Sequence, residues 1–229
     1  MIYDSTFAPT IVTKVNQEST LSTSSLLPEW ISGNVDILQY LKFFSSKVKL
    51  KGYLKMRQQL RFSGSGGQGV ITAAIILAEA AVAEGKNAVQ SQSYGPEARG
   101  GASKSEVIID DEKIFHPHVK SPDFVLAMTH KAADKYFSDL NDNGVLILDE
   151  DLVPNSPAFK NIIRVPITRL AVEKVGKSLF ANIVALGVIA KVTKLVDFDA
   201  IKKAVAHRVP PNTVEQNMTA LQIGFDSVK

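Results

Sequence analysis

The sequence contains no cysteine, and this absence removes several classes of function from consideration. Without thiols the chain has no disulfide, no cysteine nucleophile and no thiolate-held zinc or iron–sulfur cluster. The four histidines do not form the HExxH pair of a zinc-binding helix, so we expect no metal site. If the protein takes part in electron transfer, the redox centres must lie on another polypeptide.

Long apolar runs and a strong excess of charge are also missing. The longest apolar run, 179–190, is shorter than the roughly 20 residues that span a bilayer. The N-terminus lacks the basic start and apolar core of a signal peptide. Lysine and arginine number 26 against 23 acids, a net charge of +3, so nothing indicates a nucleic-acid partner. We expect a cytoplasmic protein without membrane contacts.

The chain divides into two parts of different composition. Residues 1–55 are rich in serine and threonine at 19–25 and show no sustained apolar period. We interpret them as an N-terminal extension that is disordered or not the native start, with a genuine docking arm as the alternative. Residues 56–229 are expected to form a single α/β domain.

Apolar strand-like segments alternate with helical periods beyond Met56. The predicted strands are 59–63, 87–91, 103–109, 124–128, 145–148 and 162–165. The predicted helices are 69–84, 130–140, 168–175, 178–194, 199–208 and 213–223. This order predicts a mostly parallel, Rossmann-like sheet with helices on both faces and a helical C-terminal portion. For the first helix we expect a buried side made of Val70, Ala73, Ala74, Leu77, Ala78, Ala81 and Val82.

A glycine-rich turn joins the first predicted strand to the first predicted helix. It fits GxGxxG, which permits a tight turn, and the helix start offers N–H groups and partial positive charge to an anion. We expect this turn to bind a phosphate or a similar anion, although glycines used only for packing are the alternative. The candidate residues are Gly64, Ser65, Gly66, Gly67, Gln68 and Gly69.

Two common nucleotide sites do not match this turn. A dinucleotide fold needs an acid near the end of the second strand, and residues 89–93 read Val-Gln-Ser-Gln-Ser. A phosphate-binding P-loop needs Gly-Lys-Ser/Thr, which is also absent. Ordinary NAD binding is therefore disfavoured.

A second candidate loop, 93–101, follows the second predicted strand, at the edge where such sheets bind ligands. Its arginine has the planar geometry to hold a carboxylate or phosphate through two hydrogen bonds. The alternative is an ordinary surface pair between Glu97 and Arg99. The candidate residues are Tyr94, Gly95, Glu97, Arg99, Gly100 and Gly101. The acids Asp149, Glu150 and Asp151 follow the fifth predicted strand, and we interpret them as solvated loop charge.

The two motifs GSGGQGV and SYGPEARGG, with the helix Asn182–Gly187, resemble the γ subunit of 2-oxoacid:ferredoxin oxidoreductases. The second loop is most similar to the 2-oxoglutarate and branched-chain members, and the resemblance covers about 57–225. It implies oxidative decarboxylation of a 2-oxoacid to an acyl-CoA, with the electrons passed to ferredoxin. It also implies a complex with α and β subunits, and with a δ subunit where the complex has one.

The resemblance further implies that other subunits hold thiamine diphosphate, magnesium and the iron–sulfur clusters, while this subunit helps to handle coenzyme A. We therefore expect no catalytic residue in this chain and no activity of the chain alone. One alternative is a free-standing nucleotide- or phosphate-binding α/β protein, which requires a general base or nucleophile near the two loops. A pure docking protein is the other.

Overall fold

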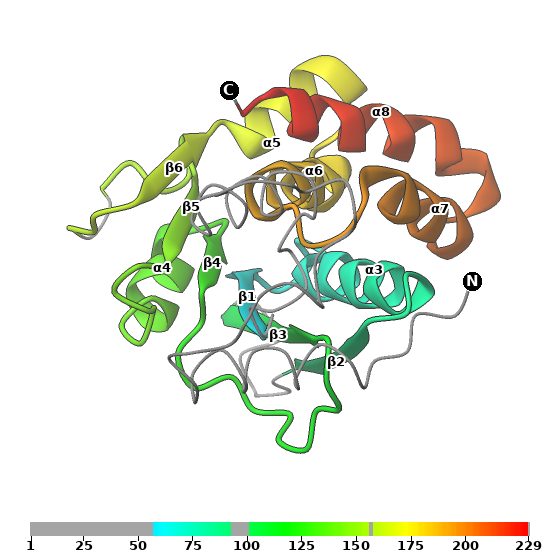
Figure 1. Ribbon diagram of the computed structural model, residues 1–229. Coiled ribbons are helices and arrows are strands. Elements are labelled where there is room, and N and C mark those ends of the chain that lie inside the picture. Colours follow the sequence, from blue (N-terminus) through cyan, green and yellow to red (C-terminus); the bar gives the residue numbers. More distant parts are fainter. Residues whose placement is uncertain (1–56, 93–100, 156–157, 229) are drawn as a thin grey trace, which may run out of the picture. The chain divides into compact units, whose positions relative to one another are not determined.

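The structure is a computed structural model that describes residues 57–92, 101–155 and 158–228 (Figure 1). All of them belong to one unit, Lys55–Lys229. The predicted extension, residues 1–55, lies outside the described residues, so its character stays a prediction. Most of the second candidate loop, 93–100, lies outside them as well.

Six strands of the described chain form one mixed sheet in the order β2-β3-β1-β4-β5-β6. Strands β1, β4, β5 and β6 pair in parallel, whereas β3 lies antiparallel to both β1 and β2. Only β3 among these six therefore opposes the common strand direction. The bounds are β1 Gln58–Ser65, β2 Asn87–Gln92, β3 Ala102–Asp110, β4 Phe124–Ala127, β5 Val145–Asp149 and β6 Ile162–Val165.

Helices follow the strands and then form the whole C-terminal portion. Two of them connect strands, α3 (Val70–Ala83) and α4 (His130–Tyr136). The C-terminal portion consists of α5 Ile167–Leu170, the π-helical turn η3 Ala171–Val175, the 3-10 turn η4 Ser178–Phe180, α6 Ala181–Thr193, α7 Phe198–Arg208, the 3-10 turn η5 Pro211–Thr213 and α8 Val214–Asp226. Alanine-rich α3 combines high helix propensity with small side chains, which lets it pack closely on the sheet.

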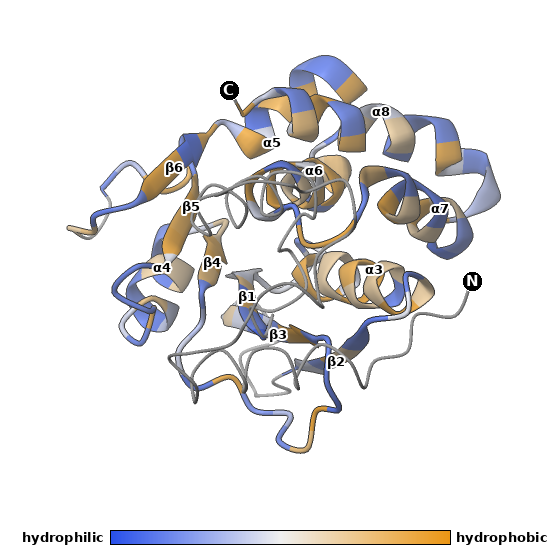
Figure 2. Ribbon diagram, in the orientation of Figure 1, coloured by the Kyte–Doolittle hydropathy of each residue, from blue (hydrophilic) through white to orange (hydrophobic). Residues whose placement is uncertain are grey.

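Apolar side chains on the two faces of the sheet form two separate cores. On one face, Leu60 and Phe62 of β1 pack with α3, α6, α7 and α8. On the other face, Val125 and Leu146 pack with Ala133 of α4. Figure 1 shows α3 and α6 on the opposite side of the sheet from α4, and Figure 2 shows hydrophilic residues on the outer turns of α7 and α8. The alternation of strand residues between the two cores follows from the two-residue period of a strand.

Helices α6 and α8 approach each other through glycines. A Cβ atom built on Gly224 would lie 1.9 Å from the carbonyl oxygen of Val184, and one on Gly187 would lie 2.2 Å from that of Leu221. These distances are far below any real contact, so only glycine permits this backbone approach. The C-terminal helices are thus fixed against α6, which is itself buried along most of its length.

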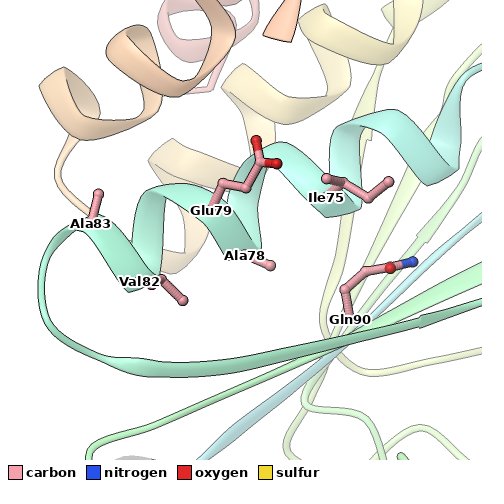
Figure 3. Close-up of a pocket in the computed structure, with 6 residues that line it drawn as sticks. All are labelled: Ile75, Ala78, Glu79, Val82, Ala83 and Gln90. Carbon is pink, nitrogen blue, oxygen red and sulfur yellow. The ribbon is translucent and has the colours of Figure 1, made fainter. Parts of the chain in front are cut away.

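The predicted fold is confirmed in class and in the location of all six strands. The predicted buried side of α3 was wrong in one residue, because Val82 is 55% exposed, and it left out Ile76, which is fully buried. Val82 lies on the flank of α3 beside the edge strand β2, where the described sheet ends (Figure 3). No helix within the described residues is long and apolar enough to cross a membrane. The cytoplasmic location stays a prediction.

Candidate functional site

The connections that leave β1 and β4 diverge at the carboxyl edge of the sheet. These two strands are parallel neighbours, with Ser63 opposite Ala127. The chain passes from β1 into α3 on one face and from β4 into α4 on the other. In open α/β sheets, ligands bind in the crevice formed where successive connections go to opposite faces. The glycine turn after β1 lies at this point (Figure 1).

The glycine turn is held by its own hydrogen bonds. The N–H of Ser65 donates to Oε1 of Gln68 at 2.7 Å, and the N–H of Gln68 donates to the carbonyl of Ser65 at 3.2 Å. A side chain on Gly64 would collide with the same Gln68 oxygen, at 2.5 Å. The N–H groups of Ser65 and Gln68 are therefore engaged in shaping the turn.

Two further glycines of the turn, Gly67 and Gly69, lie just before α3. Gly67 has φ +91° and is exposed, and a Cβ atom there would meet nothing within 4 Å. Gly69 has φ +74° and forms the N-cap of α3 without a side-chain cap, and no acid lies in the first turn. The first-turn N–H groups thus keep the partial positive charge of the helix end. The N–H groups that remain for the expected anion are those of Gly67 and of the first turn of α3.

Asn182, near the start of α6, packs against the glycine turn at Gly69. Its Nδ2 lies 3.4 Å from the carbonyl oxygen of Gly69, and a Cβ atom on Gly69 would approach that nitrogen to 2.6 Å. The segment Asn182–Gly187 of α6, which carries part of the family resemblance, is therefore in contact with the glycine turn. Position 69 requires glycine for two reasons, because its backbone is left-handed and because Asn182 leaves no room for a Cβ atom.

The second candidate loop meets the glycine turn through its last residue. Strand β3 lies between β1 and β2, so the loop connects two antiparallel neighbours instead of crossing over the sheet. The N–H of Gly66 donates to the carbonyl of Gly101 at 3.2 Å. Gly101 therefore lies beside the glycine turn. The other five candidates, Tyr94, Gly95, Glu97, Arg99 and Gly100, lie outside the described residues.

The segment after β4 also lies at this edge of the sheet, and it was not among the predicted site residues. The N–H of Met128 donates to the carbonyl of Ser63 at 2.9 Å, one residue before the glycine turn. Thr129 then caps α4 by accepting from the N–H of Ala132, and His130 opens the helix and lies 3.5 Å from Asp134. The pairing of β4 with β1 brings His130 to this edge. No local sequence pattern predicts this position.

An ion cluster around the buried Arg61 links α4 and the residues that follow it to the sheet below this edge. Arg61 is 4% exposed and donates to Glu106 of β3 at 2.7 Å and to both carboxylate oxygens of Asp139. Burial alone lowers the pKa of Arg61, but its hydrogen bonds with Asp139 and Glu106 outweigh this and leave the pKa raised. The hydrogen bond from Arg61 lowers the pKa of Asp139. The Tyr136 hydroxyl donates to Ala102 at 2.9 Å, next to the end of the second loop.

One of the three acids after β5 has a different role from the one predicted. Asp149 is fully buried and accepts hydrogen bonds from the hydroxyl of Thr168 at 2.6 Å and from its N–H at 2.9 Å. The interpretation as solvated charge was wrong for Asp149, because this buried carboxylate links β5 to α5 through hydrogen bonds. Glu150 and Asp151 are more exposed and pair with Arg169.

Metal ligands are not gathered at this edge. Within the described residues, no group of three or more histidines and acids is placed to hold a metal ion. The whole chain lacks the cysteines that hold iron–sulfur clusters. This edge has a helix start without a side-chain cap, an exposed glycine and a neighbouring loop. These features are typical of anion-binding sites. The fold defines an α/β domain of the doubly wound class.

Comparison with known proteins identifies the family. The model of the pyruvate ferredoxin/flavodoxin oxidoreductase family matches residues 59–227. The 2-oxoglutarate synthase subunit KorC of Methanocaldococcus jannaschii is 44% identical over 183 residues, which cover 78% of this chain and 98% of KorC. The chain belongs to the pyruvate ferredoxin/flavodoxin oxidoreductase family, and its likeness to a γ subunit of known structure makes it a subunit of the γ type.

Two further relatives define the extent of this domain. The crystal structure of a keto/oxoacid ferredoxin oxidoreductase γ subunit from Geobacter sulfurreducens shares 49% identity and a TM-score of 0.68, covering 74% of this chain and 97% of that one. The ketoisovalerate oxidoreductase subunit VorA of Methanothermobacter thermautotrophicus is 35% identical over 130 residues, which cover 57% of this chain but 27% of VorA. In VorA the similar region is thus part of a longer polypeptide.

Proposed function

We propose that this γ-type subunit serves a complex that oxidatively decarboxylates 2-oxoglutarate. The products are succinyl-CoA and carbon dioxide, and the electrons pass to ferredoxin. The choice of 2-oxoglutarate over a branched-chain 2-oxoacid is supported by the 44% identity with KorC along its whole length, against 35% over a shorter region of VorA. The substrate pocket is proposed to lie on partner subunits, so purified complex is needed to test the choice.

The proposed partners are α and β subunits, with a δ subunit where the complex has one, and ferredoxin. Thiamine diphosphate, magnesium and the iron–sulfur clusters are assigned to those partners. The lack of cysteine in this chain supports this division for the clusters. On this proposal the complex loses ferredoxin reduction when this chain is omitted, and the isolated chain shows no iron–sulfur absorbance.

The proposed role of the chain itself is to receive an anionic group of coenzyme A at the crevice between β1 and β4. The observation that carries this role is the hydrogen bond from Gly66 to Gly101, which joins the two motifs beside the uncapped start of α3. Gly67 and the first turn of α3 would bind phosphate oxygens through N–H groups. Arg99 would add two parallel hydrogen bonds from its planar guanidinium.

Substitution of Arg99 in the reconstituted complex tests this role. Loss of a charge-assisted hydrogen bond is worth on the order of 1.5–3 kcal/mol, or about ten- to a hundredfold in affinity. We expect Arg99→Ala to raise the Michaelis constant for coenzyme A by that factor. Arg99→Lys keeps the charge but loses the planar fork, so its effect should be intermediate if the contact is bidentate.

The matched control is Arg169→Ala, which removes a half-exposed arginine that pairs with Glu150 and Asp151. It should leave the Michaelis constants unchanged. If both Arg99 variants also leave them unchanged in an intact complex, the loop does not bind coenzyme A. If the Arg99 variants fail to join the complex, Arg99 is an interface residue and the binding role is wrong.

A further inference from the structure

Tyr136 of α4 contacts the sheet beside the glycine turn. Its hydroxyl donates to the carbonyl of Ala102, the first residue of β3, at 2.9 Å. Ala102 is buried and is the register partner of Ser65, the last residue of β1. One step beyond these paired ends, the N–H of Gly66 donates to the carbonyl of Gly101 at 3.2 Å. Tyr136 therefore binds the residue next to the hydrogen bond that joins the two motifs.

The Ala102 carbonyl points away from β1. In an antiparallel pair the backbone groups of successive residues alternate between the two sides of a strand, and Gly101 directs its carbonyl toward β1. The described residues of β2 pair with β3 as far as Ser105. Beyond that point, the hydroxyl of Tyr136 provides a hydrogen bond on this side of β3. It holds the start of β3 from the side opposite to the glycine turn.

The ion cluster around Arg61 fixes Tyr136 in its turn. Arg61 is 4% exposed and donates from Nη1 to the Tyr136 carbonyl at 2.9 Å. Arg61 also pairs with Glu106 of β3, to which Lys104 donates at 2.9 Å. The Lys104 ammonium lies 5.9 Å from the centre of the Tyr136 ring, within the range of a cation–π contact. The backbone, the ring and the hydroxyl of Tyr136 thus each have a contact of their own.

Net stability is a weak explanation for the buried pair of Arg61 and Glu106. Taking charges out of water is costly, and replacing a buried ion pair by well-packed apolar residues is often neutral or stabilising. The Tyr136 hydroxyl also adds little to packing, because phenylalanine has the same ring. What the pair and the hydroxyl provide together is a fixed distance between α4 and the start of β3.

We propose that Tyr136 is a positioning residue for the anion site at the glycine turn. By holding Ala102 it sets the position of Gly101, and Gly101 holds Gly66 next to the N–H group of Gly67. Tyr136 acts through these residues and does not itself bind the ligand, since its hydroxyl is donated to Ala102. This inference rests on the proposed function, because it takes coenzyme A as the anionic ligand.

Hydrogen exchange of two backbone amides in the isolated full chain, measured by NMR, tests the positioning itself. Tyr136→Phe keeps the ring and removes the hydroxyl. The amide of Gly66 should then exchange about three- to tenfold faster, the range expected for loss of one neutral hydrogen bond. The amide of Met128, which donates to Ser63 on the other side of β1 at 2.9 Å, should exchange as in the unmodified chain.

The Michaelis constants of the reconstituted complex test the consequence for ligand binding. Tyr136→Phe should raise the constant for coenzyme A by a similar factor and leave the constant for 2-oxoglutarate nearly unchanged. A merely structural role would reduce the amount of active complex and leave both constants as they are. Thr219→Val is the matched control, because it removes an exposed hydroxyl that donates to the carbonyl of Glu215 at 3.0 Å on α8. It should change neither constant.

Unchanged exchange of the Gly66 amide in Tyr136→Phe would overturn the inference. An unchanged Michaelis constant for coenzyme A in an assembled complex would overturn it too, as would an equal rise of that constant in Thr219→Val. Failure of the unmodified complex to use coenzyme A would refute the proposed function instead, and the Gly66 amide would still show whether Tyr136 positions the turn.

Discussion

Replacing Gly224 by alanine tests how closely α6 and α8 must approach each other. The added Cβ atom would lie 1.9 Å from the carbonyl oxygen of Val184 and 2.8 Å from its carbonyl carbon. Both neighbours are backbone atoms of a buried helix, so no side-chain rotation relieves the contact. The helices must therefore part by roughly 1.5 Å to reach ordinary packing distance, which disturbs the well-packed core between them.

The cost follows from two opposing effects. Overpacking in a core costs about 1–3 kcal/mol, and we expect the upper end here because backbone must move. Alanine recovers about 1 kcal/mol through its higher helix propensity. The net loss is about 2 kcal/mol, which corresponds to a fall in melting temperature of about 4–8 °C for a domain of this size.

Thermal unfolding of the full chain, followed by circular dichroism, measures this effect. Gln222→Ala, an exposed position on the same helix, is the control and should leave the melting temperature nearly unchanged. Gly187→Ala should behave like Gly224→Ala, since its Cβ atom would lie 2.2 Å from the carbonyl oxygen of Leu221. A melting temperature for Gly224→Ala that equals or exceeds that of the unmodified chain would refute the close approach.

Three further predictions follow from the ion cluster, the glycine turn and the domain boundary. The pKa of Asp139 is lowered by Arg61 in the folded state, so this pair stabilises the fold above the unfolded value of about 3.9 and the gain disappears as pH falls through the folded value. Asp139→Asn should therefore lower the stability at neutral pH and reduce the loss of stability that acid causes, as measured by urea unfolding at neutral pH and at a series of acid pH values. Gly69→Ala should cost about 1–2 kcal/mol from its left-handed backbone, with further cost from the contact with Asn182, and urea unfolding at neutral pH would measure it. A chain that starts at Met56 should melt within about 4 °C of the full chain, whereas a larger drop would show that residues 1–55 stabilise the domain.

The sequence predicts the elements of this fold well because their signals are local. Runs of β-branched residues such as Val107–Ile109 and the alanine-rich period of α3 decide strand or helix over a few residues. Strand order is not a local property, so the insertion of β3 between β1 and β2 does not follow from those patterns. Val82 was assigned to the core for the same reason, because the helical period does not say where a sheet ends.

The candidate site was predictable in its motifs but not in its surroundings. The glycine turn and Gly101 are found from sequence, since glycine at these spacings has a backbone reason. The buried carboxylate of Asp149 and the cluster around Arg61 depend on partners far away in the chain, including Thr168 and Asp139. The sequence around a charged residue is the same whether its side chain is solvated or ion-paired. Only the fold distinguishes these two environments.

Reconstitution of the complex with and without this chain tests the central claim most directly. Partner subunits, this chain, 2-oxoglutarate, coenzyme A and ferredoxin are mixed, and ferredoxin reduction is followed by absorbance. The account predicts reduction by the full mixture, none by this chain alone, and loss of activity when this chain is omitted. Ferredoxin reduction by the isolated chain, or full activity of the partner subunits without it, would contradict the account.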